Sequence, residues 1–420
     1  MRVALAAMAT HSFLPRTVDV RTAFLQGLPL DRPVAVFIMP PPQARVPSGS
    51  VLQPRKCAYG LTDAPRRRYA SVLHLMTDVQ LTRAPFDNGV FTQHSRGTLV
   101  FVVAVHVDGF LFGGTTEAVQ RFESSLRGAF AARPIRSGAL TFTGVRVSTV
   151  ADDVAGGISI AADQEPYVDS LKTIDITPKP AATPDARLPA TELTLYRRDT
   201  MALLLVMGQT MPYLACAAST LGRRFTRAAV HDLTAANRVV KAAKAARPLP
   251  LFFRSLRGDL RLHLFVYASS VKLGVPTAHT GVAVFASPAT GARGFLSPDT
   301  QLTLLAYASH RQRRVTHSSF AAEVYTILKE VLMALELAST QAHVFAGDAH
   351  ALAFIDVDTE DLSLYNTLDA AGSVQPKEVE AAVQELRHFS HGDTLATVTW
   401  LRARGKVADE MTKACRNTPL

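Results

Sequence analysis

The chain has 420 residues, a formal net charge of +10 and 48% hydrophobic residues, which is enough apolar material for two or three ordinary domains. This composition excludes a disordered chain, and three distant cysteines exclude a disulfide scaffold and favour a reducing compartment. No apolar run reaches the roughly 18 residues of a membrane helix, and the apolar start is too short for a secretion signal. We therefore expect a cytoplasmic or nuclear protein without membrane contact, and the basic charge favours a polyanionic partner.

The first part of the chain predicts short strands alternating with helices. An amphipathic helix is expected over 1–12, a strand at 17–20, a turn or short helix at 21–27, and a strand at 34–39 that a run of three prolines ends. A helix over 66–79, a hairpin near 108, a helix over 117–130 and paired strands at 140–147 and 157–160 follow.

The hairpin is the strongest local signal. Two apolar runs flank Asp108 and Gly109, and an Asp-Gly step between such runs is typical of a β-hairpin. Asp108 at its tip is either a plain turn residue or a metal-binding carboxylate held by a rigid hairpin.

The second part of the chain predicts a linker, helices and a further α/β unit. The proline-rich stretch 178–189 is the linker, and helices are expected over 200–221, bent at Pro212, and over 228–245. Another boundary follows at 248–250. Strands are then expected at 262–267, 282–286 and 302–308, a long helix over 319–337, a strand at 352–357, a helix over 376–388 and a strand at 395–400.

Six motifs in order resemble those of one protein family. They are the runs 18–27 (VDVRTAFLQG), 59–66 (YGLTDAPR), 106–109 (HVDG), 208–214 (GQTMPYL), 316–323 (THSSFAAE) and 399–413, with TWL at its start and ADEMTK at its end. Together they resemble the Pol polyproteins of copia-type LTR retrotransposons, in which a reverse transcriptase domain precedes a ribonuclease H domain.

This resemblance implies an α+β fold and a domain order. We expect a reverse transcriptase palm-like domain over 1–175, with an antiparallel sheet, helices and no fingers. A linker and helical thumb- or connection-like segment over 176–257 and a ribonuclease H-like α/β domain over 258–420 follow. The chain thus resembles a degenerate, N-terminally truncated copy.

The resemblance also assigns a polymerase site. Family members hold two Mg²⁺ with three Asp residues, and Asp19 and Asp108 stand at the first two positions. Gly109 stands at the third position and has no side chain to bind a metal. Phe24 stands where the family excludes a ribose 2′-hydroxyl, with core packing as the alternative. Arg66 begins three arginines that either bind phosphate or form a solvated helix face.

A second two-metal site is implied for the ribonuclease H-like domain. Glu323, Glu360 and Asp409 match three of its four carboxylates, and ordinary surface carboxylates are the alternative. Tyr267 replaces the fourth. Asp358 and then Asp348 are the other candidates for the role given to Glu360.

The polymerase site carries one more departure from the family pattern. Asp63 stands where the family has Gln near the incoming nucleotide, so its charge would repel a triphosphate.

Three functions compete. The first is a retrotransposon-derived RNA-directed DNA polymerase with ribonuclease H, acting on RNA, DNA and RNA–DNA hybrid with Mg²⁺ and impaired by one missing carboxylate in each site. The second is a non-catalytic remnant or a co-opted nucleic-acid-binding protein. The third, an unrelated α/β protein with chance motif matches, conflicts with six motifs in order.

Overall fold

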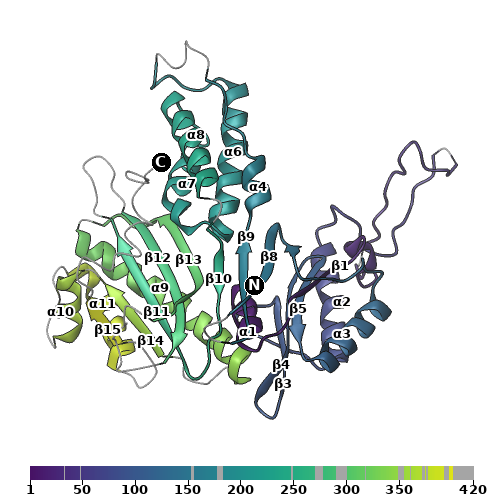
Figure 1. Cartoon of the computed structure of the whole chain (residues 1–420). Helices are drawn as coiled ribbons and strands as arrows, with labels where there is room; N and C mark the ends of the chain where they lie inside the picture. Colours follow the sequence, from purple (N-terminus) through teal and green to yellow (C-terminus); the bar gives the residue numbers. More distant parts are fainter. Residues whose placement is uncertain are drawn as a thin grey trace.

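The computed structural model shows an α+β protein with three β-sheets and a helical bundle (Figure 1), which confirms the expected fold class. The structure describes residues 1–32, 34–47, 49–152, 156–176, 183–246, 249–269, 278–289, 300–316, 318–348, 354–359, 361–370, 374, 377–391 and 397–400. None of the helices within these ranges is long and apolar enough to cross a membrane.

A six-stranded antiparallel sheet carries the N-terminal motifs, in the order β2-β3-β4-β5-β1-β6. Its strands are β1 (Arg16–Asp19), β2 (Thr82–Arg83), β3 (Val90–Ser95), β4 (Thr98–His106), β5 (Gly109–Gly114) and β6 (Arg136–Ser137). Helices α2 (Ala64–Asp78) and α3 (Thr116–Ala129) pack on one face over a core rich in phenylalanine. The hairpin expected near Asp108 is therefore β4–β5.

A smaller sheet has the order β10-β9-β8-β7. Its strands are β7 (Leu140–Phe142), β8 (Val145–Ala151), β9 (Ile158–Asp163) and β10 (Leu251–Phe253). The single strand predicted at 140–147 is wrong: Thr143 and Gly144 have φ of 50° and 80°, so the chain turns there and forms the β7–β8 hairpin. The predicted pairing with 157–160 is confirmed by β8–β9.

Helices of the middle segment form a bundle. They are α4 (Glu165–Ser170), α6 (Ala190–Gln209), η2 (Pro212–Leu214), α7 (Ala215–Gly222) and α8 (Val230–Ala245), and they share one apolar core. The helix predicted over 200–221 begins earlier, at Ala190, and breaks rather than bends at Pro212, which lacks a backbone N–H.

A five-stranded mixed sheet in the order β13-β12-β11-β14-β15 forms the C-terminal unit. Strands β11 (Leu260–Ala268), β12 (His279–Pro288) and β13 (Thr303–Arg311) are antiparallel, whereas β14 (Phe354–Thr359) and β15 (Thr397–Trp400) run parallel to β11. Helices α9 (Ser319–Ala346), α10 (Leu362–Asp369) and α11 (Glu380–His391), with η3 (Lys377–Val379), complete the ribonuclease H-like layers.

Helix α9 is longer than the predicted 319–337 because its ends are set by caps. The Ser318 side chain accepts a hydrogen bond from the Ala321 N–H, and Gly347 ends the helix with φ of 74°.

Helix α1 (Arg2–Thr10) lies at the centre of the molecule (Figure 1). Every residue from Val3 to Ala9 is buried, and the helix contacts β4, β9, β13 and α9. A helix that is apolar all round is a core element, so the prediction of an amphipathic helix is wrong. Its small alanines let it fit between the sheets and join the N-terminal and C-terminal units.

The strand predicted at 34–39 is also wrong. These residues belong to an arm that projects from the N-terminal unit (Figure 1), where Ile38 makes only an isolated bridge with Leu52. Val34, Phe37 and Met39 are 74%, 59% and 76% exposed. Their alternating pattern is typical of a strand, but among the described residues only the isolated bridge at Ile38 pairs with them.

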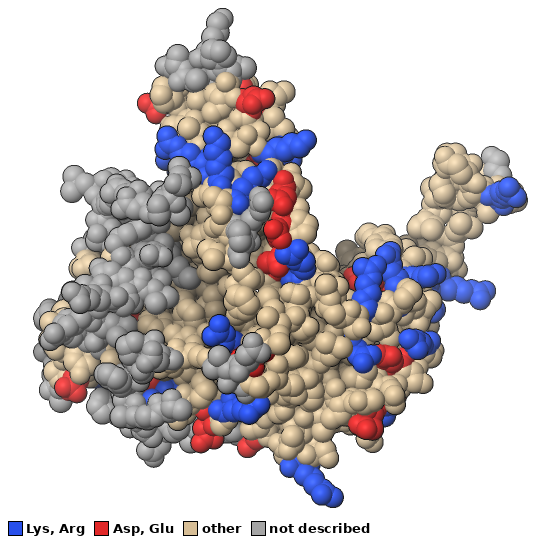
Figure 2. Space-filling view, in the orientation of Figure 1, with Lys and Arg blue, Asp and Glu red and all other residues tan. Residues whose placement is uncertain are grey.

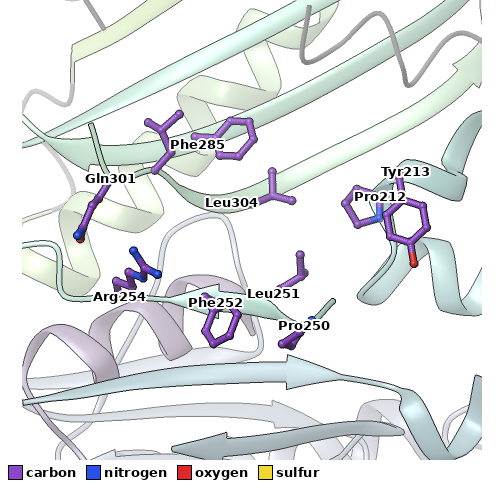
Figure 3. A pocket seen from close by; sticks show the side chains of 10 residues that line it. Pro212, Tyr213, Pro250, Leu251, Phe252, Arg254, Phe285, Gln301 and Leu304 are labelled. Atoms are coloured by element: carbon purple, nitrogen blue, oxygen red, sulfur yellow. The ribbon is translucent and has the colours of Figure 1, made fainter. Parts of the chain in front are cut away.

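An apolar groove of about 440 Å³ marks the junction of the bundle, the small sheet and the five-stranded sheet (Figure 3). It is lined by Pro212, Tyr213, Pro250, Leu251, Phe252, Arg254, Phe285, Gln301, Leu302 and Leu304.

Enlarging a side chain of α1 should destabilise the whole chain. Ala6 is fully buried, so Ala6→Leu forces a larger side chain into a packed core and should lower the free energy of unfolding by about 1–3 kcal/mol. Urea unfolding followed by circular dichroism measures this. Ala129→Leu, at the exposed end of α3, is the matched control, and an equal effect of both substitutions would contradict the central role of α1.

Candidate active sites

The β1–β5 pairing brings the two N-terminal aspartates together. Asp19 ends β1 directly opposite Gly109, the first residue of β5. Asp108 lies in the two-residue turn before it, and the Val20 N–H donates to the Asp108 carbonyl oxygen over 2.8 Å. Asp108 is exposed and Asp19 is half-buried. The hairpin therefore presents Asp108 beside the end of β1, as the resemblance implies.

The turn itself is strained. Val107 has φ of 51°, a conformation that β-branched residues rarely adopt. Residues held in this way are typical of functional sites, where the surrounding structure supports the strain.

Position 109 faces Asp19 but carries no carboxylate. A Cβ atom at Gly109 would lie 3.5 Å from Asp19 Oδ1 and 3.2 Å from Phe142 Cε2 of β7. The β-hairpin that follows the sheet therefore covers the place of the missing carboxylate with an aromatic ring. The resemblance drawn from the sequence implies a carboxylate at position 109, but no signal in the sequence predicted the contact with Phe142.

A buried cation lies next to the turn. Arg68 of α2 is 2% exposed, and its Nε donates to the Val107 carbonyl oxygen over 3.3 Å. Its guanidinium stacks at 4.3 Å from the centre of the Phe130 ring, while Nη1 and Nη2 have no hydrogen-bond partner among the described residues. Burial lowers the pKa of Arg68 to about 10, so it stays charged at neutral pH, close to Asp108.

Removing this buried charge should stabilise the protein. Arg68→Met keeps the apolar stem and removes a poorly paired guanidinium, so the free energy of unfolding should rise by about 1–3 kcal/mol. Chemical denaturation measures the change. Arg66→Met, two residues earlier and exposed, should have almost no effect. A less stable Arg68→Met variant would show that the hydrogen bond to Val107 and the ring contact outweigh the cost of burial.

The other residues assigned near this site lie around the start of α2. Phe24, in η1 (Ala23–Gln26), is half-buried and packs edge-on against the Tyr59 ring at 4.9 Å. Arg66 is exposed, which fits both a phosphate-binding residue and a residue of a solvated helix face. Asp63 is paired with Arg32, whose Nε lies 2.7 Å from Oδ2, and this hydrogen bond holds the pKa of Asp63 below its usual value. The pairing reduces the repulsion of a triphosphate that Asp63 alone would cause.

Glu323 lies near the start of α9, and its side chain reaches the end of β11. Its side chain is 3% exposed, and Oε1 accepts a hydrogen bond from the Ala268 N–H over 2.7 Å. Ala268 follows Tyr267, which stands where the resemblance implies an aspartate. The structure thus places the Glu323 carboxylate at the β11 backbone next to Tyr267. Glu360 and Asp409 lie outside the described residues, so their roles stay predictions.

The two other candidates for the third role are Asp358 and Asp348. Asp358 of β14 is buried on the face of the sheet opposite α9, because its neighbour Val357 packs in the core with α9. Burial, and then Asp356, raise the pKa of Asp358 to about 8. Asp348 follows the C-terminal end of α9, at roughly 1.5 Å per residue about 38 Å from Glu323.

Neither site presents a full set of metal ligands in the described part of the chain. There, no three His, Cys, Asp or Glu side chains lie close enough to hold a metal ion. At the first site Gly109 and the Phe142 ring replace a carboxylate, so the residues present do not fit two Mg²⁺ ions. At the second, Glu323 is the one predicted ligand that the structure describes.

The six-stranded antiparallel sheet with its aspartate hairpin, followed by the five-stranded mixed sheet, has the arrangement expected of a reverse transcriptase palm-like domain and a ribonuclease H-like domain. Residues 1–184 match the family described as reverse transcriptase (RNA-dependent DNA polymerase). This match, together with the relatives among retrotransposon Pol polyproteins, supports the resemblance drawn from the motifs.

Two Arabidopsis thaliana relatives support this assignment. The retrovirus-related Pol polyprotein from transposon RE2 is 28% identical over 47% of this chain, and that from transposon RE1 is 25% identical over 63%. The chain spans only 13% and 18% of their lengths. A foamy viral protease-reverse transcriptase, solved with dsDNA, shares the fold with a TM-score of 0.51 and 12% identity, over 93% of this chain and 68% of that one.

Proposed function

We propose that this chain is a retrotransposon-derived RNA-directed DNA polymerase with a ribonuclease H domain that binds nucleic acid but is catalytically impaired. The observation that carries the proposal is Gly109, which faces Asp19 across the β1–β5 pair and has no carboxylate. The assigned parts are the palm-like domain 1–175, the segment 176–257 and the ribonuclease H-like domain 258–420. The proposed location of the protein is the cytoplasm or the nucleus, where RNA and DNA are found.

Binding and catalysis depend on different features. Lys and Arg neutralise phosphates and release counterions, and this effect tolerates the loss of a single Asp. Figure 2 shows Lys and Arg side chains on the helical bundle and on the N-terminal unit, on both sides of the concave edge between them. Two Mg²⁺ ions close together, in contrast, need several carboxylates to offset their mutual repulsion. A single missing group that stabilises the transition state costs about 10²–10³ in rate.

The alternative is a co-opted or remnant nucleic-acid-binding protein with no turnover. Tyr267 favours it, since a second site lacks a carboxylate as well. The two proposals make the same prediction for binding and differ only in residual catalysis.

Two assays on the purified chain test the proposal. Fluorescence anisotropy with RNA, DNA and RNA–DNA hybrid should show affinities that fall steeply with KCl. Primer extension on RNA and cleavage of hybrid, each with Mg²⁺ or Mn²⁺, should stay near background. Robust polymerisation would refute the impairment, and binding that is absent or independent of salt would refute the retained function.

A further inference from the structure

A basic cleft of about 760 Å³ lies between the end of β13 and helix α9. Four cations line it, Arg311, Arg313, Arg314 and Lys329, against one carboxylate, Glu330. Neither the motifs nor the two candidate sites account for this concentration of positive charge.

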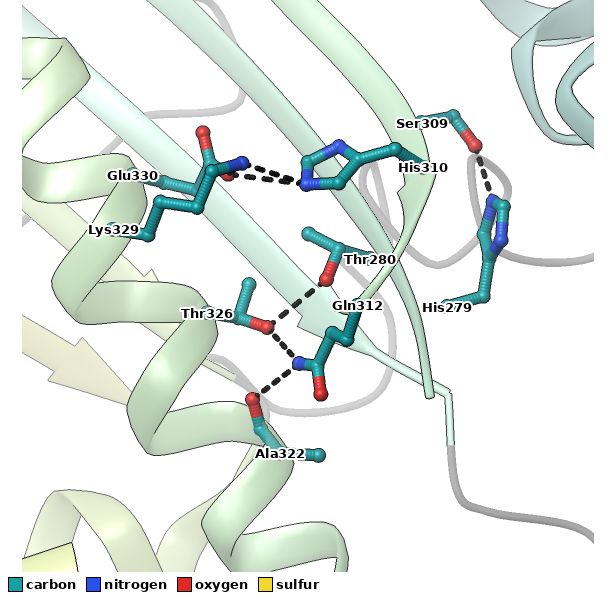
Figure 4. Close-up of polar contacts among 9 residues, drawn as sticks. All are labelled: His279, Thr280, Ser309, His310, Gln312, Ala322, Thr326, Lys329 and Glu330. Carbon is teal, nitrogen blue, oxygen red and sulfur yellow. Dashed lines mark hydrogen bonds and ion pairs between the residues drawn. The ribbon is translucent and has the colours of Figure 1, made fainter. Parts of the chain in front are cut away.

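The floor of the cleft is a buried polar network (Figure 4). Thr280 of β12 and Thr326 of α9 are hydrogen-bonded through their hydroxyls over 3.1 Å, and both are almost fully buried. The Gln312 side-chain amide donates to the Thr326 hydroxyl and, over 2.7 Å, to the Ala322 carbonyl oxygen. These bonds fix the chain that leaves β13 against α9, so the cleft is a preformed part of the fold.

The carboxylate in the cleft is already compensated. Glu330 is 2% exposed, and Lys329 Nζ lies 2.7 Å from its Oε1 (Figure 4). The same Nζ donates to His310 Nε2 over 2.7 Å, and burial together with Lys329 lowers the pKa of His310, which keeps this ring neutral. An ammonium has three N–H donors, so Lys329 keeps one for a ligand. The cleft therefore has a net positive charge.

The arginines are placed at the mouth of the cleft. Arg313 and Arg314 are exposed, and Arg314 stacks on the Tyr325 ring at 4.7 Å from its centre. A ring contact uses the face of the guanidinium and none of its N–H donors. The Tyr325 hydroxyl donates to the Glu378 carbonyl oxygen over 2.8 Å, which holds the ring in place. Planar N–H donors held in this way suit phosphate oxygens.

The cleft lies along α9 from Glu323. Lys329 follows Glu323 by six residues, roughly 9 Å along the helix axis. Six residues also turn the helix by about 600°, so Lys329 and the buried Glu323 leave α9 on different sides. We propose that this cleft binds the sugar–phosphate backbone of a nucleic-acid strand, which names a substrate contact and rests on the proposed function.

The test compares three double variants by fluorescence anisotropy with a labelled RNA–DNA hybrid over a range of KCl. Arg313→Gln/Arg314→Gln should weaken binding about tenfold or more at low salt and reduce the slope of log K against log salt by about 1.8, or about 0.9 for each lost phosphate contact. Arg313→Lys/Arg314→Lys keeps both charges and should keep the slope. Arg83→Gln/Arg96→Gln removes two exposed arginines, one from the edge strand β2 and one from the β3–β4 turn, and should leave binding unchanged.

The outcomes separate this inference from the proposed function. Suppose that the unmodified chain binds hybrid and that Arg313→Gln/Arg314→Gln leaves affinity and slope unchanged. This result would overturn the proposed role of the cleft and leave the proposed function standing. Equal losses in the two Gln pairs would also overturn it, because they would show a general effect of net charge. An unmodified chain that fails to bind at any salt concentration would overturn both.

Discussion

Gly109→Asp should give the first site its missing carboxylate and raise primer extension on the order of 10²-fold, provided that the Phe142 ring is moved. The added Cβ would lie 3.5 Å from Asp19 Oδ1, and the backbone at position 109 has no positive φ that would oppose a side chain. The ring is the obstacle, since its Cε2 would lie 3.2 Å from that Cβ. We therefore expect a small gain from Gly109→Asp alone and the full gain from Gly109→Asp/Phe142→Leu.

Metal binding gives a second readout for this prediction. Three nearby carboxylates repel one another, so the double variant should be less stable without metal and should gain stability on adding Mn²⁺, as measured by thermal unfolding. Gly109→Asn/Phe142→Leu is the matched control, with a side chain of the same size and no charge. If the Asn variant responds to Mn²⁺ as strongly as the Asp variant, the charge at position 109 is not what the site lacks.

Local sequence patterns predicted the elements that are set by local chemistry. The Asp-Gly step between two apolar runs predicted the β4–β5 hairpin, although its two-residue turn is Val107–Asp108, and the start of α9 follows from Ser318 as N-cap. Patterns failed where distant packing decides the outcome. Residues 34–39 have the pattern of a strand but form only an isolated bridge in the described part of the chain. The apolar start of the chain forms a helix that is buried on all sides.

The candidate sites show the same difference between features set by local sequence and features set by distant packing. Motif order indicated Asp19, Asp108 and Glu323, and the structure places them at β1, the hairpin and the end of β11. Arg68 was one of three consecutive arginines, a pattern typical of a solvated helix face, yet it alone of the three is buried. Its burial depends on how α2 packs against the sheet, and no residue near it in the sequence indicates that.

Acid should weaken the contact between the bundle and the C-terminal sheet. His279 of β12 is 7% exposed, and its Nδ1 accepts a hydrogen bond from Arg223, just after α7. Because a guanidinium can only donate, Nε2 carries the proton and donates to the Ser309 hydroxyl over 2.7 Å (Figure 4). A second proton on this ring would face Arg223. Burial first, then Arg223 and His310, lower the pKa of His279 to about 4.

The sign of the pH effect follows from this lowered pKa. Unfolding frees His279 to take up a proton near its ordinary pKa of about 6.5, so the unfolded state binds more protons between pH 6.5 and 4. Stability is therefore present above pH 6.5 and is lost as the pH falls through this window, by on the order of 2–3 kcal/mol from this group. Urea unfolding at pH 7, 6, 5 and 4 measures the loss.

His279→Gln isolates the contribution of this ring. The glutamine amide can accept from Arg223 and donate to Ser309, but it does not titrate in this window. Other histidines with lowered pKa values, His11, His94, His263 and His343, are present in both proteins, so their effects cancel in the difference. His310 interacts with His279, so its influence is part of the contribution that is measured. As the pH falls from 6.5 to 4, the free energy of unfolding of His279→Gln should therefore increase relative to that of the unmodified chain. Curves that stay parallel over this range would show that His279 is protonated as easily in the folded chain as in the unfolded one.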